Sequence, residues 1–245
     1  MPDFSISLAE IPIGISALYP STKVFFEQYL SNEPPAFYVA VTPQDIAFER
    51  TQSALQDKKN GKPVRTFADC YLETLAVLRK VVDSAIAHDV ILFHGSVVAV
   101  DGKAYLFAAP SGTGKTTHSG LWLDLLPNAH VLNGDKPFLK IKDGRVFACG
   151  TPWQGKEHLG CNEILPLEAI CFLEQDQENS IEPLGFREAL ELLLRQIYLP
   201  KSGDEMLKVL RMCDEIGSGV RLYRLKCNRD PQAAVVSSSV MLARK

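Results

Sequence analysis

The apolar positions of the chain recur with two periods, and the changes between them predict the secondary structure. Between Phe67 and His88 the apolar residues fall at helical spacing, which predicts one long helix. Short apolar runs fenced by turn residues predict strands at 37–41, 169–173 and 220–225. The helical positions are Leu72, Leu75, Ala76, Leu78, Val82 and Ile86.

Two Asp-Gly pairs divide apolar runs in the middle of the chain. Asp101-Gly102 divides the run 90–108, and Asp143-Gly144 divides the run 138–148. An Asp-Gly pair in this position is a strong hairpin signal, because both residues tolerate the positive φ of a type I′ turn. The sequence therefore predicts two antiparallel hairpins.

Helices are predicted at 186–198, 204–216 and 230–243, the last with Asp230 as its cap, and the polar stretch 56–63 is predicted to be a loop. The leucines of the first of these helices cover more than one helix face, which indicates burial on two sides and is compatible with a homo-oligomer. They are Leu190, Leu192, Leu193 and Leu194.

Strands, hairpins and helices in this order predict a mixed α/β (α+β) fold rather than an all-parallel sheet. The first third of the chain is richer in proline and has shorter apolar runs than the rest. We therefore expect a small N-terminal subdomain over residues 1–89 and a larger catalytic core over residues 90–245.

Composition excludes some classes of partner. The chain has 245 residues, a net charge of −3 and 46% hydrophobic residues, as in an ordinary globular protein. Mild acidity argues against nucleic acid or an anionic membrane as a partner. No apolar stretch is long enough to span a bilayer, and residues 1–15 contain acidic but no basic residues, unlike a signal peptide. A cytoplasmic location is expected.

Six cysteines are scattered through the chain without a CxxC pair, and their spacing matches no common zinc pattern. Buried thiols in a reducing compartment are the simplest interpretation. They are Cys70, Cys149, Cys161, Cys171, Cys213 and Cys227.

The strongest chemical signal is a glycine-rich loop between a predicted strand and a predicted helix. It resembles the pattern GxxxxGK[ST], with Ala109 in place of the first glycine. In such loops backbone N–H groups and the helix N-terminus bind phosphates, while Lys115 reaches the β- and γ-phosphates and the Thr116 hydroxyl binds Mg²⁺. The expected phosphate-binding residues are Ser111, Gly112, Thr113, Gly114, Lys115, Thr116 and Thr117.

A short apolar run ends in Asn133-Gly134-Asp135, about twenty residues beyond the loop. A carboxylate at the end of a strand is suited to holding Mg²⁺, or to accepting a proton from an attacking hydroxyl. The alternative is an ordinary turn aspartate, because Asn-Gly-Asp is also a turn sequence.

Together these residues resemble the phosphate loop and following strand of HPr kinase/phosphorylases and phosphoenolpyruvate carboxykinases. His94-Gly95, just before the first hairpin, corresponds to a His-Gly pair that HPr kinases carry near the active site. The resemblance covers roughly residues 90–200. It implies a compact mixed-sheet phosphate-loop core and transfer of a γ-phosphoryl group to a serine-type hydroxyl, with a divalent metal, an aspartate base and His94 beside it.

The chain departs from that family in two ways. The family usually has two adjacent aspartates after the strand, whereas this chain has Asp135 alone. Asp135 could therefore act as the base, as the metal ligand, or in both roles. No equivalent of the HPr docking region is evident, and the chain is short for a carboxykinase. A hydroxyl-bearing peptide, protein or small molecule is the expected acceptor.

A second polar string, 151–158, contains three further candidates for acceptor binding. Trp153 is a candidate wall of the acceptor pocket, Lys156 a phosphate contact, and Glu157 an aid to the metal or base. A surface loop with a packed tryptophan is the equal alternative. Any of the helix arginines Arg187, Arg195 and Arg211 is a candidate phosphate contact, although such arginines more often lie on solvated helix faces.

The sequence thus predicts a phosphotransferase that uses ATP or another nucleoside triphosphate with Mg²⁺. Lys115, Asp135 and His94 are the expected catalytic residues, and Thr116 and Asp135 the expected metal ligands. The alternative is a nucleotide-binding regulatory or assembly protein with weak hydrolysis only, which the single aspartate favours.

Overall fold

The computed structural model describes residues 3–110 and 112–243. The chain packs as two compact units, Met1–His88 and Asp89–Lys245, which are described separately. None of the helices in the described residues is both long and apolar enough to cross a membrane.

The first unit combines a three-stranded sheet with helices. Strand β2 pairs antiparallel with β1 and parallel with β3. Glu73 anchors the loop and helix after β2, because its carboxylate accepts hydrogen bonds from the backbone N–H of Leu18 and Tyr19 and from the Thr22 hydroxyl. The elements are β1 (Phe4–Leu8), β2 (Ile11–Ser16), α1 (Pro20–Phe25), η1 (Glu27–Tyr29), β3 (Phe37–Ala40), α2 (Pro43–Lys59), α3 (Asp69–Ala85) and η2 (Ile86–His88).

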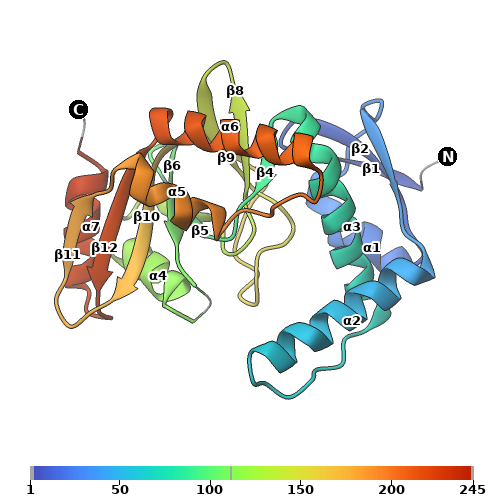
Figure 1. Ribbon diagram of the computed structural model, residues 1–245, viewed down its shortest axis with the longest axis horizontal. Helices are drawn as coiled ribbons and strands as arrows, with labels where there is room; N and C mark the ends of the chain where they lie inside the picture. Colours follow the sequence, from blue (N-terminus) through green and yellow to red (C-terminus); the bar gives the residue numbers. More distant parts are fainter. Residues whose placement is uncertain (1–2, 111, 244–245) are drawn as a thin grey trace. The chain divides into compact units, whose positions relative to one another are not determined.

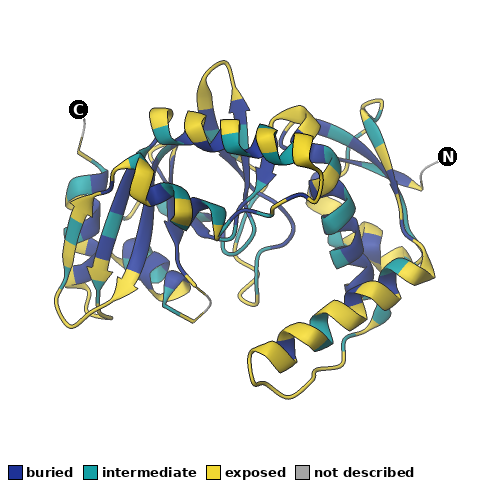
Figure 2. Cartoon of the chain, viewed as in Figure 1, coloured by how far each residue is buried: buried dark blue, intermediate teal, exposed yellow. Residues whose placement is uncertain are grey.

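The prediction of a loop over 56–63 is wrong for its first four residues, which belong to α2. Thr42 and Asp45 form a reciprocal capping box at the start of α2, and Pro43 occupies its first turn. The helix ends before Gly61, which adopts the positive φ of 64°. Most of α2 is solvent-exposed (Figure 2), so it has no apolar stripe that would have revealed it.

The second unit is built on a nine-stranded mixed sheet. The order is β4-β8-β9-β10-β6-β5-β7, and β12 pairs with both β10 and β11. The strands are β4 (Val90–Leu92), β5 (Ser96–Val100), β6 (Lys103–Ala108), β7 (Ala129–Asn133), β8 (Phe138–Lys142), β9 (Arg145–Cys149), β10 (Ile164–Gln175), β11 (Ser180–Pro183) and β12 (Arg221–Cys227).

Strand β10 joins the two parts of this sheet. Its first residues pair antiparallel with β9, and the rest lies between the parallel strands β6 and β12. The run Ala169–Leu173 is buried throughout, as expected for a parallel strand covered on both faces. Figure 2 shows the middle of β10 dark blue. The four helices are α4 (Lys115–Leu125), α5 (Phe186–Leu194), α6 (Gly203–Gly219) and α7 (Gln232–Met241).

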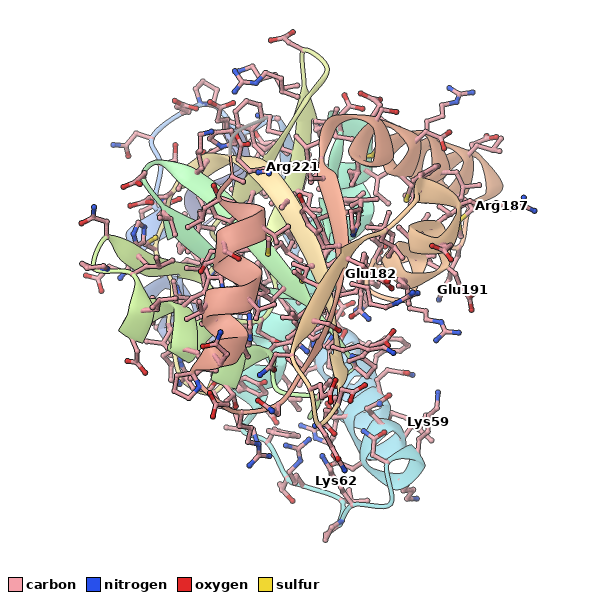
Figure 3. All side chains as sticks on the ribbon, turned by 90° about the vertical axis from the view of Figure 1, so that its left-hand side faces the viewer. Lys59, Lys62, Glu182, Arg187, Glu191 and Arg221 are labelled. Atoms are coloured by element: carbon pink, nitrogen blue, oxygen red, sulfur yellow. The ribbon has the colours of Figure 1, made fainter. Side chains whose placement is uncertain are left out.

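Helices cover both faces of these strands: α7 packs with α4, and α5 packs with α6 on the other side (Figures 1 and 3). Trp122 of α4 is fully buried against Phe107 and Tyr105, and its indole N–H donates to Ser237 of α7 at 2.8 Å. The hydrogen bond fixes α4 on the sheet. This helix begins with Lys115, so the packing also positions the glycine-rich loop.

The predicted fold class, a mixed α/β fold with antiparallel hairpins, is confirmed. Both Asp-Gly turns connect antiparallel neighbours, and all four of their residues have positive φ. The predicted helix 186–198 is too long, because α5 ends at Leu194. Instead of continuing the helix, Ile197 forms a β-bridge with Phe93, and the N–H of Tyr198 donates to Leu92 at 3.1 Å.

Candidate functional site

Three segments of the second unit meet at one edge of the sheet. Strands β6 and β7 both run antiparallel to β5, so the ends of β6 and β7 and the start of β5 share this edge. The glycine-rich loop follows β6, Asp135 follows β7, and His94 precedes β5. Strand direction thereby brings together segments that lie apart in the sequence.

The glycine-rich loop has the backbone conformation that its glycines imply. Gly112 and Gly114 have φ of 86° and 120°, in the region that residues with a Cβ rarely adopt. Ala109 replaces the first glycine without strain, because it is not among the described residues with positive φ. Ser111, a predicted phosphate contact, lies outside the described residues.

Lys115 lies at the first position of α4 and is only 8% exposed. Its ammonium donates to the carbonyl of Ala109 at 2.9 Å, across the mouth of the loop. Burial lowers the pKa of this lysine, while the nearby charge of Asp135 raises it and that of Lys136 lowers it further. A buried cation is poorly solvated and is suited to receiving an anion.

Thr113 lies inside the turn, where its N–H donates to Pro110 and its carbonyl accepts from the Gln175 side chain. Thr116 and Thr117 are exposed on the first turn of α4. Their hydroxyls are thus accessible to a ligand, as the predicted roles in binding phosphate and Mg²⁺ require. Those roles stay predictions.

Asp135 is held by a turn that Asn133 organises. The Asn133 carbonyl oxygen (Oδ1) accepts from the N–H groups of Asp135 and Lys136, at 2.9 and 2.8 Å. Its amide nitrogen donates to both the carbonyl and the hydroxyl of Thr151. Asn133 is fully buried, so this side chain fixes the backbone from which the carboxylate projects.

Both carboxylate oxygens of Asp135 face nitrogen atoms. Oδ1 lies 3.4 Å from Nε2 of His94, and Oδ2 pairs with the ammonium of Lys136. Burial acts to raise the pKa of this carboxyl, but the contacts with His94 and Lys136 outweigh it and lower the pKa to about 2. Asp135 is therefore an anion at neutral pH.

His94 is oriented by a residue that sequence reasoning did not find. Its Nδ1 lies 3.2 Å from Oε1 of Gln196, and its backbone N–H donates to the carbonyl of the same residue. The contact with Gln196 sets the orientation of the ring, in which Nε2 faces the carboxylate of Asp135. Gln196 reaches His94 because α5 ends early, and no local sequence pattern predicts that contact.

The loop 151–160 packs against the Asp135 turn. The N–H of Gly134 donates to the carbonyl of Leu159, and a Cβ at Gly155 would lie 3.1 Å from the Cβ of Asp135. Lys156 and Glu157 are exposed on this loop, so they are accessible to an acceptor. Trp153 is 5% exposed and packs on Phe138, with ring centroids 6.5 Å apart.

This packing predicts the effect of a methyl group at Gly134. A Cβ there would lie 2.8 Å from the backbone oxygen of Gln154, which cannot swing aside like a side chain. We expect Gly134→Ala to lower the free energy of unfolding by about 1–3 kcal/mol, measured by urea denaturation. Gly120→Ala is the control, because a Cβ at that helical site meets no atom within 4 Å. Equal stability of the two variants would contradict the packing.

A cavity of about 250 Å³ lies beside the glycine-rich loop. Its walls are the ends of β10 and β12, which run parallel to β6 and so finish at the same edge. His118 lines it too, and burial lowers the pKa of this imidazole to about 4, so it is neutral. The lining residues are Thr113, Gly114, Thr117, His118, Leu173, Gln175, Asp176, Cys227, Asn228 and Arg229.

A larger cavity, of about 440 Å³, lies at the opposite edge of the sheet, where β6 and β12 begin. Two of the three cations that line it are already paired, because Lys103 and Arg221 both contact Glu168, at 3.0 and 3.7 Å, and the third is Arg145. Arg221 also donates to the carbonyls of Met241 and Ala243 at the end of α7. Lys103 and Arg221 therefore have structural roles in these ion pairs and hydrogen bonds.

The arginines proposed as phosphate contacts lie on solvated surfaces in two cases. Arg195 is 66% exposed and pairs with Glu191 one turn earlier on α5. Figure 3 shows Arg187 and Glu191 projecting outward from the same helix. Arg211 lines a separate cavity with Asp89 and Asp204. Lys136, which neighbours Asp135, is instead the further cation that the structure adds to the site.

No protein-family model matches the chain, and no curated protein matches it. Among solved structures the chain is similar to the Hpr(Ser) kinase/phosphatase from Coxiella burnetii, at 9% sequence identity and a TM-score of 0.38. The likeness covers 62% of this chain and 96% of that chain. A TM-score this low carries no conclusion about activity.

Proposed function

We propose that this protein is a phosphotransferase that moves the γ-phosphoryl group of ATP or another nucleoside triphosphate to a hydroxyl acceptor. One observation carries the proposal: a buried lysine on a glycine-rich loop and an ionised, histidine-bound aspartate share one sheet edge. The lysine suits the donor phosphates, and the aspartate suits the acceptor hydroxyl.

The donor phosphates are assigned to residues 111–117. The positive φ of Gly112 and Gly114 turns the loop tightly around its centre, and the N-terminus of α4 adds the partial positive charge of its N–H groups. Lys115 exchanges the Ala109 carbonyl for phosphate oxygens, which are stronger partners for an ammonium group.

The nucleoside is assigned to the cavity beside the loop. Gln175 links the two, because its side chain lines the cavity and donates to the carbonyl of Thr113 at 3.1 Å. Arg229 and the neutral His118 offer a planar cation and a ring near the base. Asp176 and Asn228 supply polar atoms for its edge.

The acceptor hydroxyl is assigned to Asp135. The oxygen of the acceptor hydroxyl attacks the γ-phosphorus. The bond between that phosphorus and the β–γ bridging oxygen breaks, and the nucleoside diphosphate departs. A carboxyl group with a pKa of about 2 is a weak base, so Asp135 orients the hydroxyl and accepts its proton late, as the new ester bond forms. Gln196 holds His94 against Asp135 throughout.

The residues present suit Mg²⁺, which prefers one or two carboxylates together with substrate phosphates. Thr116 and Asp135 are the residues that would hold it, and it would supply neutralisation of charge on the phosphates. Because Lys136 and His94 occupy both oxygens of Asp135, a metal ligand role requires Lys136 to move toward the phosphates instead.

Tracing the phosphate tests the proposal. The full chain is incubated with Mg²⁺ and γ-labelled ATP, without acceptor and with serine-containing peptides, free serine, small alcohols or HPr. We expect label on one of these hydroxyl compounds. Label found only in free phosphate, at the same rate with every acceptor, would contradict a kinase and favour a nucleotide-hydrolysing regulatory protein.

A further inference from the structure

The outer edge of β7 carries a cluster of side chains that phosphate transfer does not use. One edge of β7 pairs with β5, and residues 159–163 run antiparallel along the other. Asn133 forms a β-bridge with Gly160, and the N–H of Cys161 donates to the carbonyl of Leu132 at 3.1 Å. This register places Glu163 opposite His130.

Three side chains of different chemistry gather on one face of this strand pair. Cys161 and Glu163 are two residues apart, so they lie on the same face, and His130 meets them from β7. Nε2 of His130 is 2.9 Å from Oε2 of Glu163. The imidazole nitrogen, thiol sulfur and carboxylate oxygen all lie within 4.8 Å of one another.

We propose that His130, Cys161 and Glu163 bind a divalent transition metal ion of the zinc class. Imidazole, thiolate and carboxylate are all ligands of zinc, and the three would fill three positions of a tetrahedron, leaving the fourth to water. A thiolate selects against Mg²⁺ and Ca²⁺, which take oxygen ligands. Within residues 3–110 and 112–243, no other three His, Cys, Asp or Glu side chains gather in this way.

The surroundings of the cluster permit metal binding. The side chains of His130 and Glu163 are 49% and 45% exposed, so they can adjust to the 2.0–2.3 Å bonds that zinc requires. Burial, and then the charge of Glu163, raises the pKa of the Cys161 thiol to about 11. A metal ion must displace this proton to solvent, and the ion then becomes the partner of the negatively charged Glu163.

A metal ion here would join two distant parts of the chain. The ligands come from β7 and from the segment that follows the loop 151–160, thirty residues later. The two residues just before this segment, Leu159 and Gly160, are joined to β7 through Gly134 and Asn133, next to Asp135. Metal binding would hold this segment in place, whether or not the protein transfers phosphate.

Cobalt(II) serves as the probe, because its spectrum reports both geometry and sulfur ligation. The full chain is freed of metal with a chelator, kept reduced, and titrated with Co²⁺. We expect one equivalent to produce tetrahedral visible bands and a thiolate-to-cobalt charge-transfer band, both removed by Zn²⁺ and unaffected by Mg²⁺. Cys161→Ser should abolish the charge-transfer band, and Glu163→Gln should weaken binding at least about tenfold.

Cys70→Ser is the matched control, because this cysteine lies in the first unit and should leave the spectrum unchanged. Far-ultraviolet circular dichroism identifies variants that fail to fold, and in that case Glu163→Gln alone tests the site. A wild-type protein without the charge-transfer band, or a band that persists in folded Cys161→Ser, would overturn the proposal.

Discussion

Replacing Lys115 with methionine is expected to abolish phosphoryl transfer while leaving the fold intact. Methionine fills a similar volume but lacks the ammonium, so the phosphates lose the one buried cation of the loop. Loss of a preorganised charge that stabilises the transition state typically costs on the order of 100-fold or more in rate. Initial rates of label transfer from γ-labelled ATP measure the effect, and equilibrium binding of ATP measures the accompanying loss of affinity.

The stability of this variant separates a functional lysine from a structural one. The ammonium is desolvated, and burial lowers its pKa, so the folded protein is destabilised by keeping it charged. We expect Lys115→Met to unfold at the same or a higher urea concentration than the wild type. Lys201→Met, at an exposed position, is the control for both measurements. Full transfer activity in Lys115→Met would remove this lysine from the site.

The parts of the fold that follow local rules were predictable from the sequence. The Asp-Gly pairs located both hairpins of the second unit, since few other sequences accept positive φ at two consecutive positions. The β1–β2 hairpin could not be predicted in this way. Its turn residues, Ala9 and Glu10, also have positive φ, but they are not residue types typical of such turns.

The candidate site likewise contains residues that the sequence predicts and residues that only the structure reveals. Lys115 and Asp135 follow strands in a recognisable pattern, so their common edge can be anticipated once strand directions are known. Gln196 reaches His94 over an interval of 102 residues, and only because α5 ends early. Lys136 adjoins Asp135 in the sequence, but its pairing with that carboxylate depends on the turn that the buried Asn133 organises.

Trp153 shows why a residue type cannot indicate which way a side chain points. Tryptophan is suited both to lining a ligand pocket and to filling a core. The neighbouring Thr151 is fully buried, and its hydroxyl donates to the carbonyl of Lys136. This end of the loop therefore lies in the interior. Trp153 follows it into the space beside Phe138, while Lys156 and Glu157, beyond Gly155, remain exposed.

Replacing Asp135 with asparagine is expected to separate binding from transfer. Asparagine keeps the shape of the side chain and can still accept a hydrogen bond from His94 or Lys136, but it carries no charge and cannot take a proton. We expect transfer to fall on the order of 1,000-fold, as for loss of a general base. Affinity for ATP without metal should stay equal or increase, because a negative charge near the phosphates is removed while Lys115 and Lys136 remain.

Asp143→Asn is the matched control for this prediction. Asp143 has φ of 53° in the β8–β9 turn, a conformation that asparagine accepts well, so this variant loses one carboxylate without strain or contact with the site. For both variants, label transfer is measured with Mg²⁺, and ATP binding is measured both with and without Mg²⁺. Wild-type transfer in Asp135→Asn would exclude Asp135 from the reaction. Equal loss of binding and transfer would instead assign this carboxylate to holding the metal–nucleotide complex, because an acceptor-side residue has no reason to weaken ATP binding.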